Sequence, residues 1–230
     1  MHLQHYPAAP PLPDAVPWPP DESLWLQLLH EVHDAPVPAA NAFLDGALHC
    51  HPFAGWQLQG VWPTEAQVLF DLFKPLLDLQ TRTGEWVVAQ LGQSLDGCVA
   101  TRTGDSQFIN GPDNIRHLHR LRALSDAVLI GAGSVAADDP QLTTRHVPGP
   151  NPVRVLLDPR LGLEALVPTA KVFVDREVPT LWLTDARWGA RAESLVGRER
   201  TLAVDGLLRD DGTPELSLAV AALRARGLKR

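Results

Sequence analysis

The residues best suited to chemistry lie where an apolar run ends in glycine and two aspartates follow. Leu129-Ile-Gly-Ala-Gly-Ser134 is followed by Asp138-Asp139-Pro140. Glycine lets backbone N–H groups approach an anion, and a helix start adds a favourable dipole. Ser134 adds a hydroxyl donor, and Asp138, four residues later, shares its face on a short helix. The pattern predicts an anion-binding turn. As alternatives, Gly131 and Gly133 also suit a plain strand-to-helix turn. The two aspartates also suit an Asx turn that stops the helix.

A second group of candidates consists of arginines that suit an anionic partner. In a helix over residues 112–124, the apolar face is marked by Ile115, Leu118 and Leu121. Arg122 falls within that face by helical geometry. A guanidinium binds phosphate or carboxylate bidentately, so Arg122 is expected to clamp an anion or else to extend to solvent from the core edge. Arg145, which follows Leu142-Thr-Thr144, is a second clamp or a solvated side chain.

Two other loops carry polar residues with competing interpretations. Ser94-Leu-Asp-Gly97 has the composition of an ordinary turn. In Thr103-Gly-Asp-Ser-Gln-Phe108, Ser106 is expected to contact a ligand or to cap a turn. Phe108 is expected to stack on a flat ring or to fill the core.

The histidines and cysteines predict no metal site. His49-Cys50-His51 holds three potential ligands, but adjacent residues cannot easily reach one tetrahedral ion, and no second pair has ligand spacing. His117 and His119 lie away from the predicted apolar face and are expected to be solvated. Two cysteines imply no disulfide framework.

Composition predicts a cytoplasmic globular protein with no membrane and no nucleic-acid partner. The 230 residues are 45% apolar and 20% charged. No run of apolar residues is long enough for a span, and the N-terminus lacks a signal-peptide pattern. The net charge is −7, and residues 1–84 hold nine acidic and two basic side chains, so no basic face for nucleic acid is expected.

These candidates must be positioned by an alternation of strands and helices that begins at Glu85. Residues 1–84 predict a Pro-rich tail and an acidic helical extension, with helices over 21–33 and 64–79 and an irregular stretch over 34–63. Pro75 is expected to kink or end the second helix. The following elements are predicted in 85–230: strands over 86–91, 126–131, 153–157, 171–174 and 180–184, helices over 112–124 and 214–226, and a short turn over 133–137. This order predicts an α/β fold with a mainly parallel sheet flanked by helices.

The stretch from Trp86 to Asp185 resembles the pyrimidine reductase domain of bacterial riboflavin biosynthesis, whose fold is similar to dihydrofolate reductase. The matching motifs are Ser94-Leu-Asp-Gly97, Thr103-Gly-Asp-Ser106, His119-Arg-Leu-Arg122, Gly131-Ala-Gly-Ser-Val135, Asp138-Asp-Pro-Gln-Leu-Thr143 and Pro152-Val-Arg-Val-Leu-Leu-Asp-Pro159.

The resemblance implies that NADPH delivers a hydride to the ribose C1′ of 5-amino-6-(5-phosphoribosylamino)uracil, which yields the ribitylamino compound. It implies an NADPH site of Gly92, Phe108, Gly131, Gly133, Ser134, Asp138 and Pro159, with phenylalanine where the family often has tryptophan. It implies a substrate site of Ser106, Arg122, Leu142 and Arg145, and a homodimer. Asp138 is the one candidate for a catalytic proton donor.

Two departures from the family pattern accompany the resemblance. Residues 1–84 carry none of the zinc ligands of the deaminase that precedes the reductase in bifunctional relatives. The family's glutamate-and-glycine motif would follow the last helix, so the reductase domain is expected to be truncated and to lack its last strands. The alternatives are a reductase of the same fold for a pterin or another flavin-related ring, and a non-catalytic binding or assembly module. The helices of the extension are expected to pack on the core, cover a dimer surface or bind a partner.

Overall fold

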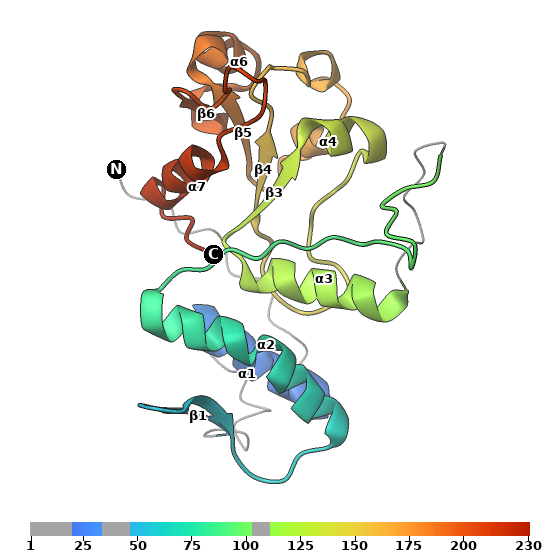
Figure 1. The fold of residues 1–230 in the computed structure, drawn as a ribbon, viewed down its shortest axis with the longest axis vertical. Coiled ribbons are helices and arrows are strands. Elements are labelled where there is room, and N and C mark those ends of the chain that lie inside the picture. Colours follow the sequence, from blue (N-terminus) through green and yellow to red (C-terminus); the bar gives the residue numbers. More distant parts are fainter. Residues whose placement is uncertain (1–19, 34–46, 103–110) are drawn as a thin grey trace. The chain divides into compact units, whose positions relative to one another are not determined.

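A computed structural model describes residues 20–33, 47–102 and 111–230 (Figure 1). Contacts divide the chain into two compact units. The first comprises the chain up to Leu91 together with Pro148–Pro150, and the second comprises Gly92–Val147 and Asn151–Arg230. Residues 85–91 thus count with the first unit, while the domain boundary expected after residue 84 stays a prediction.

The first unit is built on two helices, α1 (Pro20–His33) and α2 (Thr64–Thr83). Both helices bury apolar residues at helical spacing, and the rings of Trp25 on α1 and Phe73 on α2 lie 5.6 Å apart. The prediction of a helix over 21–33 is therefore confirmed. A two-stranded antiparallel hairpin, β1 (Leu48–His51) and β2 (Gly55–Leu58), occupies part of the stretch that was expected to be irregular.

Pro75 does not end α2, so that part of the prediction is wrong. The helix continues to Thr83, where Gly84 adopts a left-handed conformation (φ 70°) and donates its N–H to the carbonyl of Gln80. Phe73, Leu76 and Leu77 are all buried around the proline. Their burial on both sides of Pro75 offsets the one backbone hydrogen bond that proline removes.

The second unit contains a four-stranded parallel sheet in the order β3-β4-β5-β6 (Figure 1). The strands are β3 (Ala127–Gly131), β4 (Val153–Leu157), β5 (Thr180–Asp185) and β6 (Thr201–Val204). The helices are α3 (Pro112–Leu124), α4 (Ala132–Asp138), α5 (Lys171–Val174), α6 (Gly189–Val196) and α7 (Leu216–Ala225), and single turns of 3-10 helix occur at Glu164–Leu166, Ala186–Trp188 and Arg198–Arg200. This arrangement confirms the predicted α/β fold with helices flanking a parallel sheet.

The two faces of the sheet carry separate apolar cores. On one face, Leu156 and Trp182 pack with Val135 of α4, Phe173 of α5 and Ala192 of α6. The other face has Val155, Leu157, Leu181 and Leu183, which pack with Leu207 and with Ala219 and Leu223 of α7. Strands buried on both faces explain the continuous apolar runs that the sequence shows at β4 and β5.

Two strand predictions are wrong. Residues 86–91 form no strand; Val87 and Leu91 are each more than 60% exposed, and no neighbouring backbone pairs with them among the described residues. Residues 171–174 form α5, in which Val172 and Phe173 enter the core as one helical turn. Such short apolar runs fit a strand or a helix equally well until their neighbours are known.

Both charged residues of β4 and its exit are buried. Arg154 is fully buried, and Asp158 is 2% exposed. The Asp158 carboxylate accepts hydrogen bonds from the N–H groups of Gly162 (2.8 Å) and Leu163 (2.9 Å) and from Trp182 Nε1 (3.0 Å). These bonds fix the turn that leaves the carboxyl end of β4.

After α7 the chain returns to the start of β3. The N–H groups of Lys229 and Arg230 donate to Asp126 Oδ2, each at 2.9 Å. Over the part of the chain that the structure describes, no helix is both long and apolar enough to span a membrane.

Candidate ligand-binding site

The turn after β3 is open toward solvent. Gly131 precedes α4 in an extended conformation (φ −75°, ψ 152°), and a Cβ added at Gly131 or Gly133 would meet no atom within 4 Å. Val135 is the one buried residue of α4 and anchors it to the core. Ser134 and Asp138, four residues apart on this helix, are both exposed. The open turn therefore leaves room for a ligand at the backbone and beside both side chains.

The two adjacent aspartates have different surroundings. Asp139 caps α4 in a left-handed conformation (φ 40°), its Oδ1 accepts the N–H of Lys171 at 2.8 Å, and its Oδ2 lies 3.3 Å from Lys171 Nζ. Asp138 forms no such contact within the described residues and points to solvent at the end of α4. The helix-stop interpretation thus applies to Asp139, while Asp138 is available to a ligand.

The sheet register brings a second predicted residue to this edge. Gly131 at the end of β3 pairs with Leu157 at the end of β4, and Pro159 follows two residues later. Ligands of α/β proteins bind at the carboxyl ends of parallel strands, which is where both residues lie. Gly92 begins the second unit in a segment without regular structure, and Ser106 and Phe108 lie outside the described residues.

Arg122 and Arg145 converge on one residue. Arg122 Nη1 donates to the carbonyl oxygen of Thr143 at 3.3 Å, and Arg145 Nη1 donates to Thr143 Oγ1 at 2.8 Å. Burial, followed by the positive charge of Arg145, lowers the pKa of Arg122 from its ordinary value. Within the described part of the chain neither guanidinium pairs with a carboxylate. Neighbouring guanidinium groups of this kind suit a phosphate or carboxylate, which makes this pair a candidate anion site.

The loop that leads to Arg145 has a strained backbone. Leu142 adopts φ 58°, and its side chain is 5% exposed in the core beside Val135 and Leu156. A left-handed conformation is costly for a non-glycine residue and is often found at functional sites. Because the Leu142 side chain faces the core, only its backbone can serve the substrate contact that the sequence predicted.

The predicted faces of α3 are partly wrong. The buried residues of α3 are His119, Ala123 and Leu124, whereas Ile115 is 36% exposed. His119, which was expected to be solvated, is 2% exposed and its Nδ1 accepts the backbone N–H of Arg145 at 3.0 Å. The hydrogen bond from Arg145 makes burial of the imidazole possible. Arg145 lies in a loop outside the helix, so the periodicity of α3 could not predict this contact.

His119 should make the stability of the protein depend on pH. Burial, together with the positive charges of Arg122, His146 and Arg145, lowers its pKa from 6.5 to about 4. Between these values the unfolded chain binds a proton that the folded protein does not, so stability is full above pH 6.5 and falls toward pH 4. In urea unfolding experiments across this range, His119→Asn should show a shallower fall than the natural protein. Equal slopes would contradict the pKa assignment.

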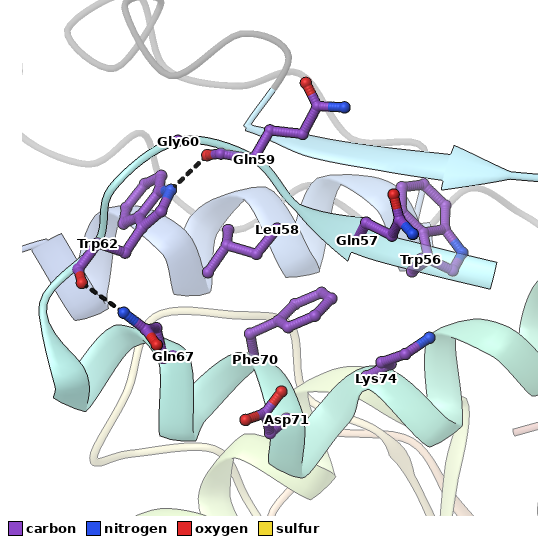
Figure 2. Close-up of a pocket in the computed structure, with 10 residues that line it drawn as sticks. All are labelled: Trp56, Gln57, Leu58, Gln59, Gly60, Trp62, Gln67, Phe70, Asp71 and Lys74. Carbon is purple, nitrogen blue, oxygen red and sulfur yellow. Dashed lines mark hydrogen bonds between the residues drawn. The ribbon is translucent and has the colours of Figure 1, made fainter. Parts of the chain in front are cut away.

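A separate cavity of about 490 Å³ lies within the first unit, between β2 and α2 (Figure 2). Leu58 and Phe70 face each other across its middle, while Trp62 closes one end and Trp56 and Lys74 lie at the other. Trp62 Nε1 donates to the carbonyl of Gln59, and Gln67 Nε2 donates to the carbonyl of Trp62, both at 2.7 Å. None of these residues was a site candidate from the sequence, where Trp56 and Trp62 fall in the stretch that was expected to be irregular.

The structure is an α/β domain with a glycine turn open at the carboxyl edge of its sheet and two neighbouring arginines that, within the described residues, pair with no carboxylate. The chain belongs to the RibD C-terminal domain family, whose model matches residues 85–230. The resemblance stated from the sequence is thus confirmed, and the flanked parallel sheet is the dihydrofolate reductase-like architecture of that family.

Curated relatives match parts of the chain. It is 38% identical over 132 residues to riboflavin biosynthesis protein RibD of Chlamydia pneumoniae, covering 56% of this chain and 33% of that protein. It is 33% identical over 148 residues to 2,5-diamino-6-ribosylamino-4(3H)-pyrimidinone 5′-phosphate reductase of Methanothermobacter thermautotrophicus, covering 63% of this chain and 64% of that protein. The chain thus spans about a third of the RibD relative and less than two thirds of the archaeal reductase.

Solved structures agree on the fold. A deaminase/5-amino-6-(5-phosphoribosylamino)uracil reductase from Thermotoga maritima matches with TM-score 0.51 and 26% identity, over 71% of this chain and 42% of that chain. A pyrimidine reductase-like protein from Corynebacterium diphtheriae matches with TM-score 0.51 and 22% identity, over 69% of this chain and 68% of that chain. The second likeness supports the fold alone.

Proposed function

We propose that this protein is an oxidoreductase of riboflavin biosynthesis that reduces 5-amino-6-(5-phosphoribosylamino)uracil to its ribitylamino product with NADPH. The observation that carries the proposal is the convergence of Arg122 and Arg145 on Thr143, in a family whose relatives are named as reductases of phosphorylated pyrimidines. A phosphate clamp favours this substrate over a pterin, which has no phosphate to bind.

The turn after β3 suits NADPH. Gly131 and Gly133 leave the backbone open to an anionic group, and Ser134 and Asp138 offer an exposed hydroxyl and carboxylate on one helix. We assign Gly92, Phe108 and Pro159 to the same site by the family resemblance. When bound, NADPH supplies the hydride, and these residues bind and orient it.

The chain's own contribution to the reaction is mainly positioning. Arg122 and Arg145 hold the substrate phosphate, with Ser106 and the Leu142 backbone as further contacts, and so fix the ribose for attack at C1′. If the ribose opens, a nearby acid must protonate the ring oxygen, and the exposed carboxyl of Asp138 is our candidate.

We further propose a homodimer, as the family resemblance implies, and a cytoplasmic location. Both cysteines, Cys50 and Cys98, are free thiols, which suits a reducing compartment.

Binding of NADPH tests the nucleotide half of the proposal. Titration of the full chain, followed by tryptophan fluorescence, should give saturable binding that is stronger for NADPH than for NADH. Absence of binding by either nucleotide would favour the alternative of a non-catalytic module.

Replacing Ser134 by alanine should raise the KM for NADPH by about two- to tenfold, because a single hydrogen bond contributes roughly 0.5–1.5 kcal/mol. The KM for the pyrimidine should stay unchanged. Ser194→Ala is the matched control, since Ser194 is exposed on α6 and its hydroxyl donates to the carbonyl of Arg191 in the same helix. An unaltered KM for NADPH in Ser134→Ala would remove this residue from the nucleotide site.

A further inference from the structure

His119 is linked to both arginines of the proposed phosphate clamp. It precedes Arg122 by three residues on α3, a spacing that puts both side chains on neighbouring parts of the helix surface. Its Nδ1 accepts the backbone N–H of Arg145 at 3.0 Å, across 26 residues of sequence. One imidazole therefore connects the helix that carries Arg122 to the loop that carries Arg145.

The bond to Arg145 requires a neutral imidazole. Nδ1 can accept an N–H only when it carries no proton itself. The His119 side chain is 2% exposed, and the ring of His146 packs against it edge to face at 4.5 Å. Burial and the surrounding positive charges keep its pKa at about 4, so it accepts this bond throughout the neutral range. A neutral His119 can hold the Arg145 backbone without binding the anion itself.

The loop that carries Arg145 is held residue by residue. Arg122 bonds the carbonyl of Thr143, Asn151 Oδ1 accepts the N–H of Thr144 at 2.7 Å, and His119 holds the N–H of Arg145. The Arg145 side chain is exposed, and its guanidinium donates to Thr143 Oγ1. The hydrogen bond to the Arg145 backbone therefore fixes the point from which this side chain extends. Holding the backbone in advance lowers the cost of ordering the clamp around a ligand.

We propose that His119 is a positioning residue of the phosphate clamp, which fixes the Arg145 backbone so that Arg122 and Arg145 face one anion. The substrate part of this inference rests on the proposed function.

Two variants separate the hydrogen bond from the volume of the side chain. His119→Asn retains an acceptor oxygen near the position of Nδ1, and His119→Leu fills a similar space without an acceptor. In the full chain, His119→Leu should raise the KM for the phosphorylated pyrimidine about tenfold, the equivalent of one hydrogen bond. Its kcat and its KM for NADPH should stay within about twofold of the natural values, and His119→Asn should restore the KM.

A second readout needs no substrate. Amide hydrogen exchange at Arg145 in the ligand-free protein should be faster in His119→Leu and unchanged in His119→Asn. Inorganic phosphate, titrated while the Arg145 amide is followed by NMR, should bind more weakly to His119→Leu than to the natural protein. Unfolding in urea verifies that both variants remain folded.

The outcomes distinguish the two proposals. The positioning role would be overturned if His119→Leu and His119→Asn had the same KM for the pyrimidine and the same amide exchange at Arg145. It would also be overturned if the KM for NADPH rose in His119→Leu as much as the KM for the pyrimidine. If the natural protein does not reduce the pyrimidine but His119→Leu weakens phosphate binding, the proposed function fails and the positioning role stands. If the natural protein is active and His119→Leu binds substrate normally, the positioning role fails and the proposed function stands.

Discussion

Replacing Arg122 by alanine should raise the KM for the phosphorylated pyrimidine by about 10- to 150-fold, because a hydrogen bond to a charged group contributes roughly 1.5–3 kcal/mol. Arg122 is half-buried and forms no ion pair within the described residues. Its guanidinium can therefore pair with an anionic ligand. The KM for NADPH should change little, since we assign the nucleotide to the glycine turn after β3. Steady-state kinetics with each substrate varied in turn measure both constants.

Two further variants make the Arg122 result specific. Arg122→Lys keeps the charge but loses the planar fork, so its KM should fall between those of the natural protein and the alanine variant. Arg116→Ala is the matched control, because Arg116 lies on the same helix with its side chain exposed. A KM for the pyrimidine that is the same in Arg122→Ala and Arg116→Ala would show that Arg122 holds no phosphate.

Replacing Arg154 by methionine should cost the protein about 3 kcal/mol of stability or more, because each buried acceptor left without its donor costs roughly 1–3 kcal/mol. Arg154 is fully buried in β4, where its Nε donates to Thr180 Oγ1 and its Nη1 to Asp175 Oδ2, both at 2.9 Å. Its Nη2 donates to the carbonyls of Asp175 and Val178. Methionine fills much of the space but leaves these acceptors without donors.

Urea unfolding of the full chain measures this loss. Arg198→Met is the control, since Arg198 is exposed in a 3-10 turn and its replacement should stay within about 0.5 kcal/mol. The double variant Arg154→Met, Asp175→Asn should lose less than the sum of the single variants, because the two residues share one interaction. A loss for Arg154→Met no larger than for Arg198→Met would contradict the structural role.

Local signals in the sequence predicted several elements with correct bounds. Pro112 opens α3 where expected, and the Val153–Leu157 run forms β4 as predicted. Both signals are local, since proline suits a first helical turn and a continuous apolar run suits a strand buried on both faces. The predicted strand at 171–174 failed because four apolar residues fit either structure, and only the core that receives Phe173 decides between them.

The candidate site required long-range information that periodicity does not contain. The role of Asp139 depends on Lys171, which lies 32 residues further along the chain. The burial of His119 depends on Arg145, 26 residues away. The sequence predicted an anion clamp at Arg122 from its residue type and its position on the helix. It predicted a solvated His119 because this residue lies away from the apolar face marked by Ile115, Leu118 and Leu121.

The reductase proposal is tested most directly by following the hydride. The full chain is incubated with 5-amino-6-(5-phosphoribosylamino)uracil and NADPH that carries deuterium at the transferred position, and the product is analysed by mass spectrometry and NMR. The proposal predicts a ribitylamino product with one deuterium at C1′ and an equal amount of NADP⁺. Protein that binds NADPH and the phosphorylated pyrimidine but forms no deuterated product would contradict it.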